Sequence, residues 1–201
     1  MRRQLKHNPV ANAFEPAARF IAVAGGYWLM LIAAATCVEV ISRKVFSFSL
    51  LGVDEVGGYT LAVLAALGFS YALVDRAHTR IDFLIGRLPA SVKAGANVLA
   101  MFTLAAMAIF AVWRGLDVLK ESIEFQSRAP TPLQTPLWIP QTLWLAGLAF
   151  FAVVATALAL HAGLLMVSDR RRLNTFYGPP TLEEEIEKEV GALRERQDSP
   201  T

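Results

Sequence analysis

The sequence contains few residues that could build a catalytic, metal or haem site. Cys37 is the only cysteine among 201 residues, which excludes an internal disulfide and a cysteine-based metal cluster. The three histidines, His7, His78 and His161, lie far apart in the chain, whereas a haem inside a helical bundle needs histidines that face one another as axial ligands. We therefore expect His161 to be an ordinary packed or interfacial residue.

Motifs for other kinds of chemistry are also missing. The sequence has no glycine-rich phosphate-binding loop, no nucleophile placed beside a base and no pair of acidic residues at membrane depth. These absences argue against an enzyme. We predict no cofactor, no metal and no nucleic-acid partner.

Apolar residues are what the sequence has in excess. They make up 55% of the chain, the mean hydropathy is +0.44, and only 18% of the residues are charged. A bilayer core of ~30 Å needs roughly 20 apolar residues in a helix. Four runs meet this length: Phe20–Ile41, Val53–Val74, Val92–Trp113 and Trp138–Val167. The sequence therefore predicts an all-α integral membrane protein with a four-helix transmembrane domain over residues 20–167.

The positive charges predict how the chain crosses the membrane, because Lys and Arg near the ends of spans are retained in the cytoplasm. They gather in segment 1–19, between the second and third runs, and after the fourth run. We therefore expect both termini in the cytoplasm, with a cytoplasmic or interfacial segment over 1–19 and a cytoplasmic tail over 168–201. In the tail, Thr181 and Glu184 form a capping box before an apolar stripe, which predicts a short amphipathic helix.

The connection between the third and fourth runs predicts two further elements. Leu116, Leu119 and Ile123 alternate with charged residues at helical spacing, so we expect an amphipathic extension of the third helix as far as Glu124. The prolines that follow predict a stiff, extended return, because each removes a donor and disfavours helix in the preceding residue. They are Pro130, Pro132, Pro136 and Pro140. Trp138 is placed to anchor the fourth helix at the membrane surface.

Small residues form stripes on two of the predicted helices. The residues recur every four positions, as Gly58, Ala62, Ala66 and Ser70 in the second run and as Ala18, Ala22 and Gly26 near the first. In lipid, such stripes allow helix backbones to approach closely. We expect these faces to pack either on a neighbouring helix of this chain or on a second protein.

Charged residues are confined to the ends of the predicted spans. Glu39 and Arg43 stand four residues apart at the outer end of the first span, and Asp54 and Glu55 begin the second span on the same side. We expect Glu39 and Arg43 to pair. The group predicts a polar clamp between helices or across a subunit boundary, and an ordinary interfacial salt bridge is the alternative.

A second polar group follows the second span. It contains Asp75, Arg76, His78, Arg80 and Asp82. We expect these residues at headgroup level on the cytoplasmic side, where they would orient the turn between the second and third spans and contact a partner. Simple interfacial anchoring is the alternative.

A resemblance to a known family runs through the second span. Residues 53–84 read VDEVGGYTLAVLAALGFSYALVDRAHTRIDFL, and they resemble the signature of the small permease subunit of tripartite ATP-independent periplasmic (TRAP) transporters, the DctQ-like family. The matching pairs are Glu55 and Tyr59, Leu67 and Gly68, and His78 and Asp82. The segment TPLWIPQTLW resembles the family's entry into the fourth span, so the likeness extends over Phe20–Val167. Gly58 departs from the pattern, because many members carry Arg at this position.

The resemblance implies a non-enzymatic, multi-pass subunit of the bacterial inner membrane. In the family, such a subunit pairs in the lipid bilayer with a much larger permease subunit that carries the substrate and sodium sites, and a periplasmic binding protein delivers an organic anion. The chain would then be a scaffold, or stator, for the large subunit in sodium-driven uptake of an organic acid such as a dicarboxylate. The alternatives from other classes are a stand-alone four-helix exporter and a cytochrome-type membrane anchor.

Overall fold

The structure is a computed structural model that describes residues 8–49, 52–75, 89–178 and 190. Its named elements are all helices: α1 (Pro9–Phe46), α2 (Val53–Val74), α4 (Ala90–Glu124), α5 (Trp138–Ser168) and α6 (Arg170–Tyr177). Four of them are long and apolar enough to cross a membrane. The predicted all-α fold with four candidate spans is confirmed, whereas the orientation of the chain across the membrane stays a prediction.

The helix boundaries agree closely with the hydropathy at α2 and α5 and differ at α1. The predicted extension of the third span is confirmed, because α4 runs without a break to Glu124. Helix α1 begins at Pro9 rather than at Phe20. The Asn8 side chain accepts a hydrogen bond from the Val10 amide at 3.0 Å, and Pro9 is preorganised for a first helical position. Local capping therefore begins this helix well before the sequence becomes apolar.

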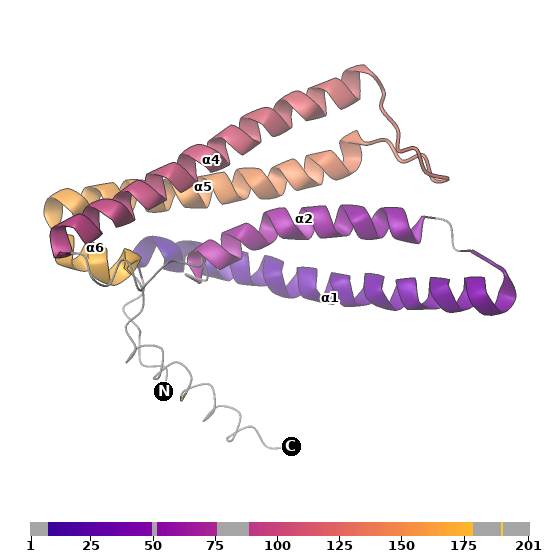
Figure 1. Ribbon diagram of the computed structural model, residues 1–201, viewed down its shortest axis with the longest axis horizontal. Coiled ribbons are helices and arrows are strands. Elements are labelled where there is room, and N and C mark those ends of the chain that lie inside the picture. The colour runs from indigo at the N-terminus through magenta and orange to yellow at the C-terminus, as the bar shows by residue number, and fades with distance from the viewer. Residues whose placement is uncertain (1–7, 50–51, 76–88, 179–189, 191–201) are drawn as a thin grey trace.

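The four long helices lie side by side in the order α1, α2, α5, α4 (Figure 1). Helices α1 and α2 form one antiparallel hairpin, α4 and α5 form another, and the contact between α2 and α5 joins them. One end of this layer carries the end of α1, the start of α2 and the connection 125–137, and we call it the elbow end. The other end carries α6, which packs on both α4 and α5, and we call it the α6 end.

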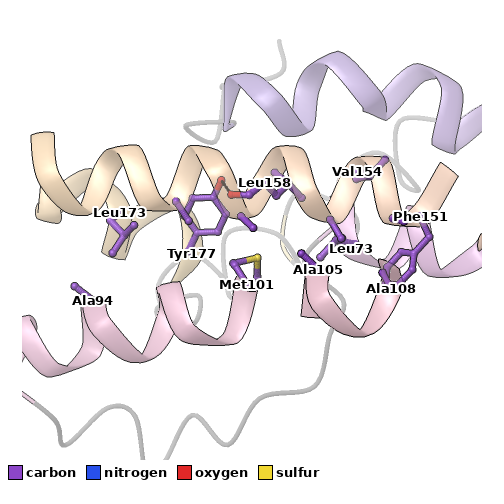
Figure 2. Packing of buried hydrophobic residues seen from close by; sticks show 14 residues of the cluster. Leu73, Ala94, Met101, Ala105, Ala108, Phe151, Val154, Leu158, Leu173 and Tyr177 are labelled. Carbon is purple, nitrogen blue, oxygen red and sulfur yellow. Dashed lines mark hydrogen bonds between the residues drawn. The ribbon is translucent and has the colours of Figure 1, made fainter. Parts of the chain in front are cut away.

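Helix α5 lies inside the layer, and the core of the protein is built around it. Half of its most apolar window is buried, compared with 6% for α1 at the edge. Figure 2 shows Phe151 and Leu158 of α5 packing with Leu73 of α2, Met101 of α4 and Tyr177 of α6. Many of the remaining core residues are alanines of α4 and α5, which let the two backbones approach closely where burial from water gives no driving force.

The seam between α2 and α5 is tightest at Gly147. A Cβ atom at this position would lie 3.0 Å from the Ala66 Cβ and 3.2 Å from the Leu67 backbone nitrogen. Both neighbours belong to the α2 helix itself, so neither can move without displacing the helix. Gly147 therefore sets how closely the two hairpins approach.

The seam between α1 and α2 follows a seven-residue repeat. Ala18, Gly25 and Glu39 are the buried residues of α1, and the half-buried Ile32 completes the series at the same spacing. Leu64 of α2 fills the space beside Gly25, where a Cβ atom would lie 2.5 Å from its Cδ2. Trp28 of α1 adds a hydrogen bond from its ring nitrogen to the Thr60 hydroxyl at 3.0 Å.

The predicted four-residue stripes pack within the chain only in part. Ala66 and Ser70 are buried in the seam, whereas Gly58 and Ala62 are exposed. On α1, Ala18 is buried and Ala22 half-buried, but Gly26 is exposed and the buried glycine is Gly25. Each four-residue step advances about 40° around a helix, whereas a seven-residue step drifts by only about 20°. A stripe spaced by four therefore turns away from a neighbour that a stripe spaced by seven keeps facing.

The extension of α4 keeps its small residues toward α5 and its larger apolar residues outward. Gly115 and Ser122 are buried, while Leu116 and Ile123 are exposed. A Cβ atom at Gly115 would lie 2.8 Å from the Leu145 Cδ1 and 3.2 Å from the Trp144 ring. The amphipathic stripe expected from the sequence is thus uncovered, apart from the half-buried Leu119, in the described residues.

The Gly147 contact predicts a selective loss of stability. Gly147→Ala places a methyl group against the α2 backbone and is expected to lower the free energy of unfolding by about 1–3 kcal/mol, the usual cost of overpacking. Gly68→Ala is the matched control in a helix interior, because no atom lies within 4 Å of its added Cβ. It should be neutral or slightly stabilising. Unfolding titrations in mixed micelles measure both, and equal effects would contradict the assignment.

Candidate functional site

Polar side chains from both hairpins meet at the first turn of α2. Glu55 is buried there and accepts hydrogen bonds from the Tyr59 hydroxyl at 2.8 Å and from the Thr131 hydroxyl. Thr135 hydrogen-bonds the same carboxylate through both its side chain and its backbone. A single carboxylate of one hairpin therefore holds the connection 125–137 of the other, which we call the elbow.

The elbow is a narrow hairpin-like loop. The Ala129 amide donates to the Thr135 carbonyl and the Leu137 amide to the Ser127 carbonyl, both at 3.0 Å, and Arg128 bridges Pro136 in antiparallel fashion. A tight turn closes the loop through the Gln134 amide and the Thr131 carbonyl at 3.0 Å. The sequence predicted an extended return; the loop instead turns back between Thr131 and Gln134, and Pro140 lies in the first turn of α5.

The tip of the elbow also makes an apolar contact with the start of α2. Leu133 packs on Gly52, where a Cβ atom would lie 3.1 Å from the leucine Cδ2. Gly52 has φ +98°, which an L side chain rarely adopts. Glycine is needed here both for its conformation and for the space that Leu133 occupies.

A second polar group ties α1 to the same end of the layer. Glu39 is 2% exposed and lies 2.9 Å from the Arg43 Nη2. The Ser49 hydroxyl donates to the Glu39 Oε1 at 2.8 Å, and Arg43 Nη2 lies 3.9 Å from the Asp54 Oδ2 on α2. The predicted pairing of Glu39 with Arg43 is confirmed. The Glu39 carboxylate is buried and bonded within α1 and the residues that follow it, and the Arg43–Asp54 approach is the contact that links this group to α2. The polar clamp between helices stays a prediction.

The α6 end is closed by a hydrogen-bonded tyrosine. Tyr177 donates its hydroxyl proton to the Leu158 carbonyl at 3.0 Å, and its oxygen lies 2.8 Å from His161 Nδ1. Asn97 of α4 donates to the Asn174 side chain of α6 at 3.3 Å. The expectation that His161 is a packed residue is confirmed by its contacts with Tyr177 and with the Phe176 ring.

The described residues among those singled out in the sequence lie at the elbow end, along α2 and at the α6 end. Glu39, Arg43, Glu55 and Tyr59 lie in the clamps at the elbow end, where Trp138 is the partly exposed first residue of α5. Gly58 and Ala62 lie on the outward face of α2, and Ala66 lies in the seam. Asp75 is the residue that ends α2 at the α6 end. Arg76, His78, Arg80, Asp82 and the tail helix predicted from Thr181 lie outside the described residues.

Two features of the structure were not predicted from the sequence: the threonine partners of Glu55 and helix α6. The partners of Glu55, Thr131 and Thr135, belong to the repeated letters TPL in TPLQTPL, and that repeat was the available signal. Helix α6 was not predicted because Arg170, Arg171 and Arg172 were assigned to the start of the cytoplasmic tail over 168–201. Its signals were Asp169, whose carboxylate caps the Arg171 and Arg172 amides at 3.0 and 3.1 Å, and the buried pair Leu173 and Tyr177 one turn apart.

Ionisable side chains are sparse along the described middle parts of α1 and α2. No group of three or more His, Cys, Asp or Glu side chains among them could hold a metal ion. Along α1 no charged residue occurs between Arg19 and Glu39, and along α2 none occurs between Glu55 and Asp75. The polar groups that the structure describes serve to join helices and loops.

Comparison with known proteins gives one match. A family model described as "Tripartite ATP-independent periplasmic transporters, DctQ component" matches residues 32–162. Searches of curated proteins and of solved structures gave no match. The matched region is narrower at both ends than the Phe20–Val167 expected from the motifs. It contains both clamps at the elbow end and most of α5, and it leaves out α6 and the first part of α1.

The elbow clamp predicts which threonines matter. The double change Thr131→Val and Thr135→Val removes hydroxyl donors from Glu55, and each lost hydrogen bond to a charged group is expected to cost about 1.5–3 kcal/mol. The Ala129 and Leu137 amides should then exchange faster in hydrogen–deuterium exchange. Thr142→Val is the matched control, because that hydroxyl bonds only the Trp138 carbonyl of its own helix. Unchanged exchange in the double variant would show that Glu55 does not hold the elbow.

Proposed function

Because this chain belongs to the DctQ component family of the tripartite ATP-independent periplasmic (TRAP) transporters, we propose that it is a stator for the large permease subunit. The chain is a membrane component of a transporter and not an enzyme. In the proposed role it braces the partner in the inner membrane and does not itself carry the substrate. The large subunit would bind sodium and an organic acid such as a dicarboxylate, delivered by a periplasmic binding protein.

The distribution of charge is the observation that carries this proposal. A path for an organic anion or a cation needs polar or ionisable groups at membrane depth. In the described parts of the four candidate spans the charged residues lie toward the helix ends, and α5, the innermost helix, has none between Trp138 and Ser168. Such a chain is suited to support a pathway that another subunit provides.

The layered arrangement supports the same role. A single layer leaves apolar side chains uncovered on its faces, among them Leu61 of α2. Gly58, on the same outward face as Ala62, has no atom within 4 Å of an added Cβ. A helix of another protein can therefore approach the α2 backbone closely at this point. We assign this face of α2 to contact with the large subunit.

The orientation proposed from the positive charges places the elbow end in the periplasm and both termini in the cytoplasm. The elbow is held in one conformation by Glu55 and by the packing of Leu133 on Gly52. A fixed loop loses less conformational freedom on binding than a mobile one. We propose that the elbow helps to receive the periplasmic binding protein.

Purification and transport measurements test the stator role. Affinity purification from native membranes in a mild detergent, followed by mass spectrometry, is expected to recover a large multi-span permease in near-equal amount. Gly58→Trp should lose this partner while the unfolding midpoint of the chain is unchanged. Gly26→Trp adds the same bulk at an exposed glycine of the edge helix α1 and is expected to retain the partner.

Reconstitution into liposomes separates the stator from the alternative functions. The purified chain alone is expected to give no uptake of organic acid, and uptake should appear only when the large subunit and the binding protein are added. Substrate-dependent flux through the chain alone would identify an exporter. A visible haem spectrum of the purified chain would identify a cytochrome-type anchor.

A further inference from the structure

Helix α6 fixes a group of basic side chains at one end of the layer. Leu173 and Tyr177 of α6 are buried against α4 and α5, so the helix is anchored by its apolar face. Its other face carries Arg170, Arg171 and Arg172, all exposed. These guanidinium groups belong to a packed element, and their height relative to the spans is therefore set by the fold.

Few of the donors of these arginines are used within the described part of the chain. Arg172 pairs with Asp169, Nε to Oδ2, at 3.2 Å, and the Arg170 Nε donates to the Met166 carbonyl at 3.4 Å. Arg171 makes no side-chain hydrogen bond or ion pair there. Lys93 of α4 lies at the far end of α6, with its Cε 3.7 Å from a Cβ built on Gly178. The net charge of this group is positive, and Asp169 already occupies the first amides of α6.

The arginines follow directly on an exposed apolar surface at the end of α5. In the last turns of α5, Leu164 is 70% and Val167 90% exposed, and both are apolar residues of a candidate span. Arg170 comes three residues after Val167, just past the extended Asp169 that separates α5 from α6. The guanidinium groups therefore lie next to the edge of the hydrocarbon layer, at the depth of the phospholipid headgroups.

We propose that the exposed face of α6 binds the phosphate groups of anionic phospholipids. Guanidinium groups present paired donors that match phosphate oxygens, and basic residues beside a span attract anionic headgroups. The apolar side chains of Leu164 and Val167 would contact the acyl chains of the same lipid. This inference depends on the position of α6 and not on the stator role, so either can fail without the other.

Lipid binding to the full-length chain tests the proposal. The chain is purified in mild detergent, freed of native lipid and titrated with phosphatidylglycerol or phosphatidylcholine, and bound lipid is counted by native mass spectrometry. The wild type should prefer phosphatidylglycerol. Each basic residue near an anionic surface contributes roughly a fivefold factor in affinity. The triple change R170Q, R171Q and R172Q should therefore weaken phosphatidylglycerol binding on the order of 100-fold at low salt.

Two further variants separate lipid recognition from misfolding and from net charge. The triple change to lysine keeps the charge but loses the paired donors, so it should bind phosphatidylglycerol more weakly than the wild type and more tightly than the glutamine variant. The triple change K44Q, K120Q and R128Q removes equal charge from exposed residues at the elbow end and should leave binding unchanged. Equal binding by the glutamine variant and the wild type would overturn the proposal, as would an equal loss in the elbow-end control.

The acidic residues that follow α6 in the sequence define the remaining outcome. Glu183, Glu184 and Glu185 are near enough in the chain to compete for the arginines. If phosphatidylglycerol binds only after these residues are changed to glutamine, the arginines are occupied by the chain itself and the proposal is wrong. If the wild type binds and the substitution changes affinity by less than about threefold, the lipid is the occupant.

Discussion

The close approach of α2 and α5 at Gly147 is the contact on which the rest of the structure depends. It is the main joint between the two helical hairpins, since α1 contacts the second hairpin to a smaller extent. In lipid this joint gains little from burial of apolar surface, and it depends on close packing of backbones. The missing side chain at Gly147 allows that packing. The elbow clamp joins the same two hairpins at one end of the layer.

Polar contacts at the two ends of the layer add to the packing of α2 on α5. Glu55 joins the elbow of one hairpin to the first turn of the other, and Arg43, paired with Glu39 on α1, lies 3.9 Å from Asp54 at the start of α2. At the opposite end Tyr177 holds α6 on α5. Two segments that carry the family resemblance, the start of the second span and the entry to the fourth, therefore meet in space at Glu55 and Thr135. The proposed stator role requires a layer joined in this way.

Hydropathy alone located the membrane spans, because a span must be long and apolar wherever it packs. It placed α2 and the start of α5 at their observed bounds, and the charge pattern found the Glu39–Arg43 pair. The choice between Gly25 and Gly26, or between Ala66 and Ala62, depends on which way a helix faces, and that is fixed only by its neighbours. Thr131 and Thr135 could not be paired with Glu55 from the sequence, because the contact joins residues more than seventy positions apart. Helix α6 could not be predicted from an apolar pattern, because its buried face consists only of Leu173 and Tyr177.

The central claim is that the two hairpins form one rigid layer, and a distance across that layer tests it most directly. Spin labels on the exposed Cys37 of α1 and on Met107→Cys of α4, also exposed, report the separation of the edge helices by pulsed electron paramagnetic resonance. The account predicts one narrow distance distribution in the assembled transporter, identical with and without sodium, substrate and binding protein. A distribution that splits or shifts when substrate is added would show that the hairpins move during transport, and it would contradict the stator role.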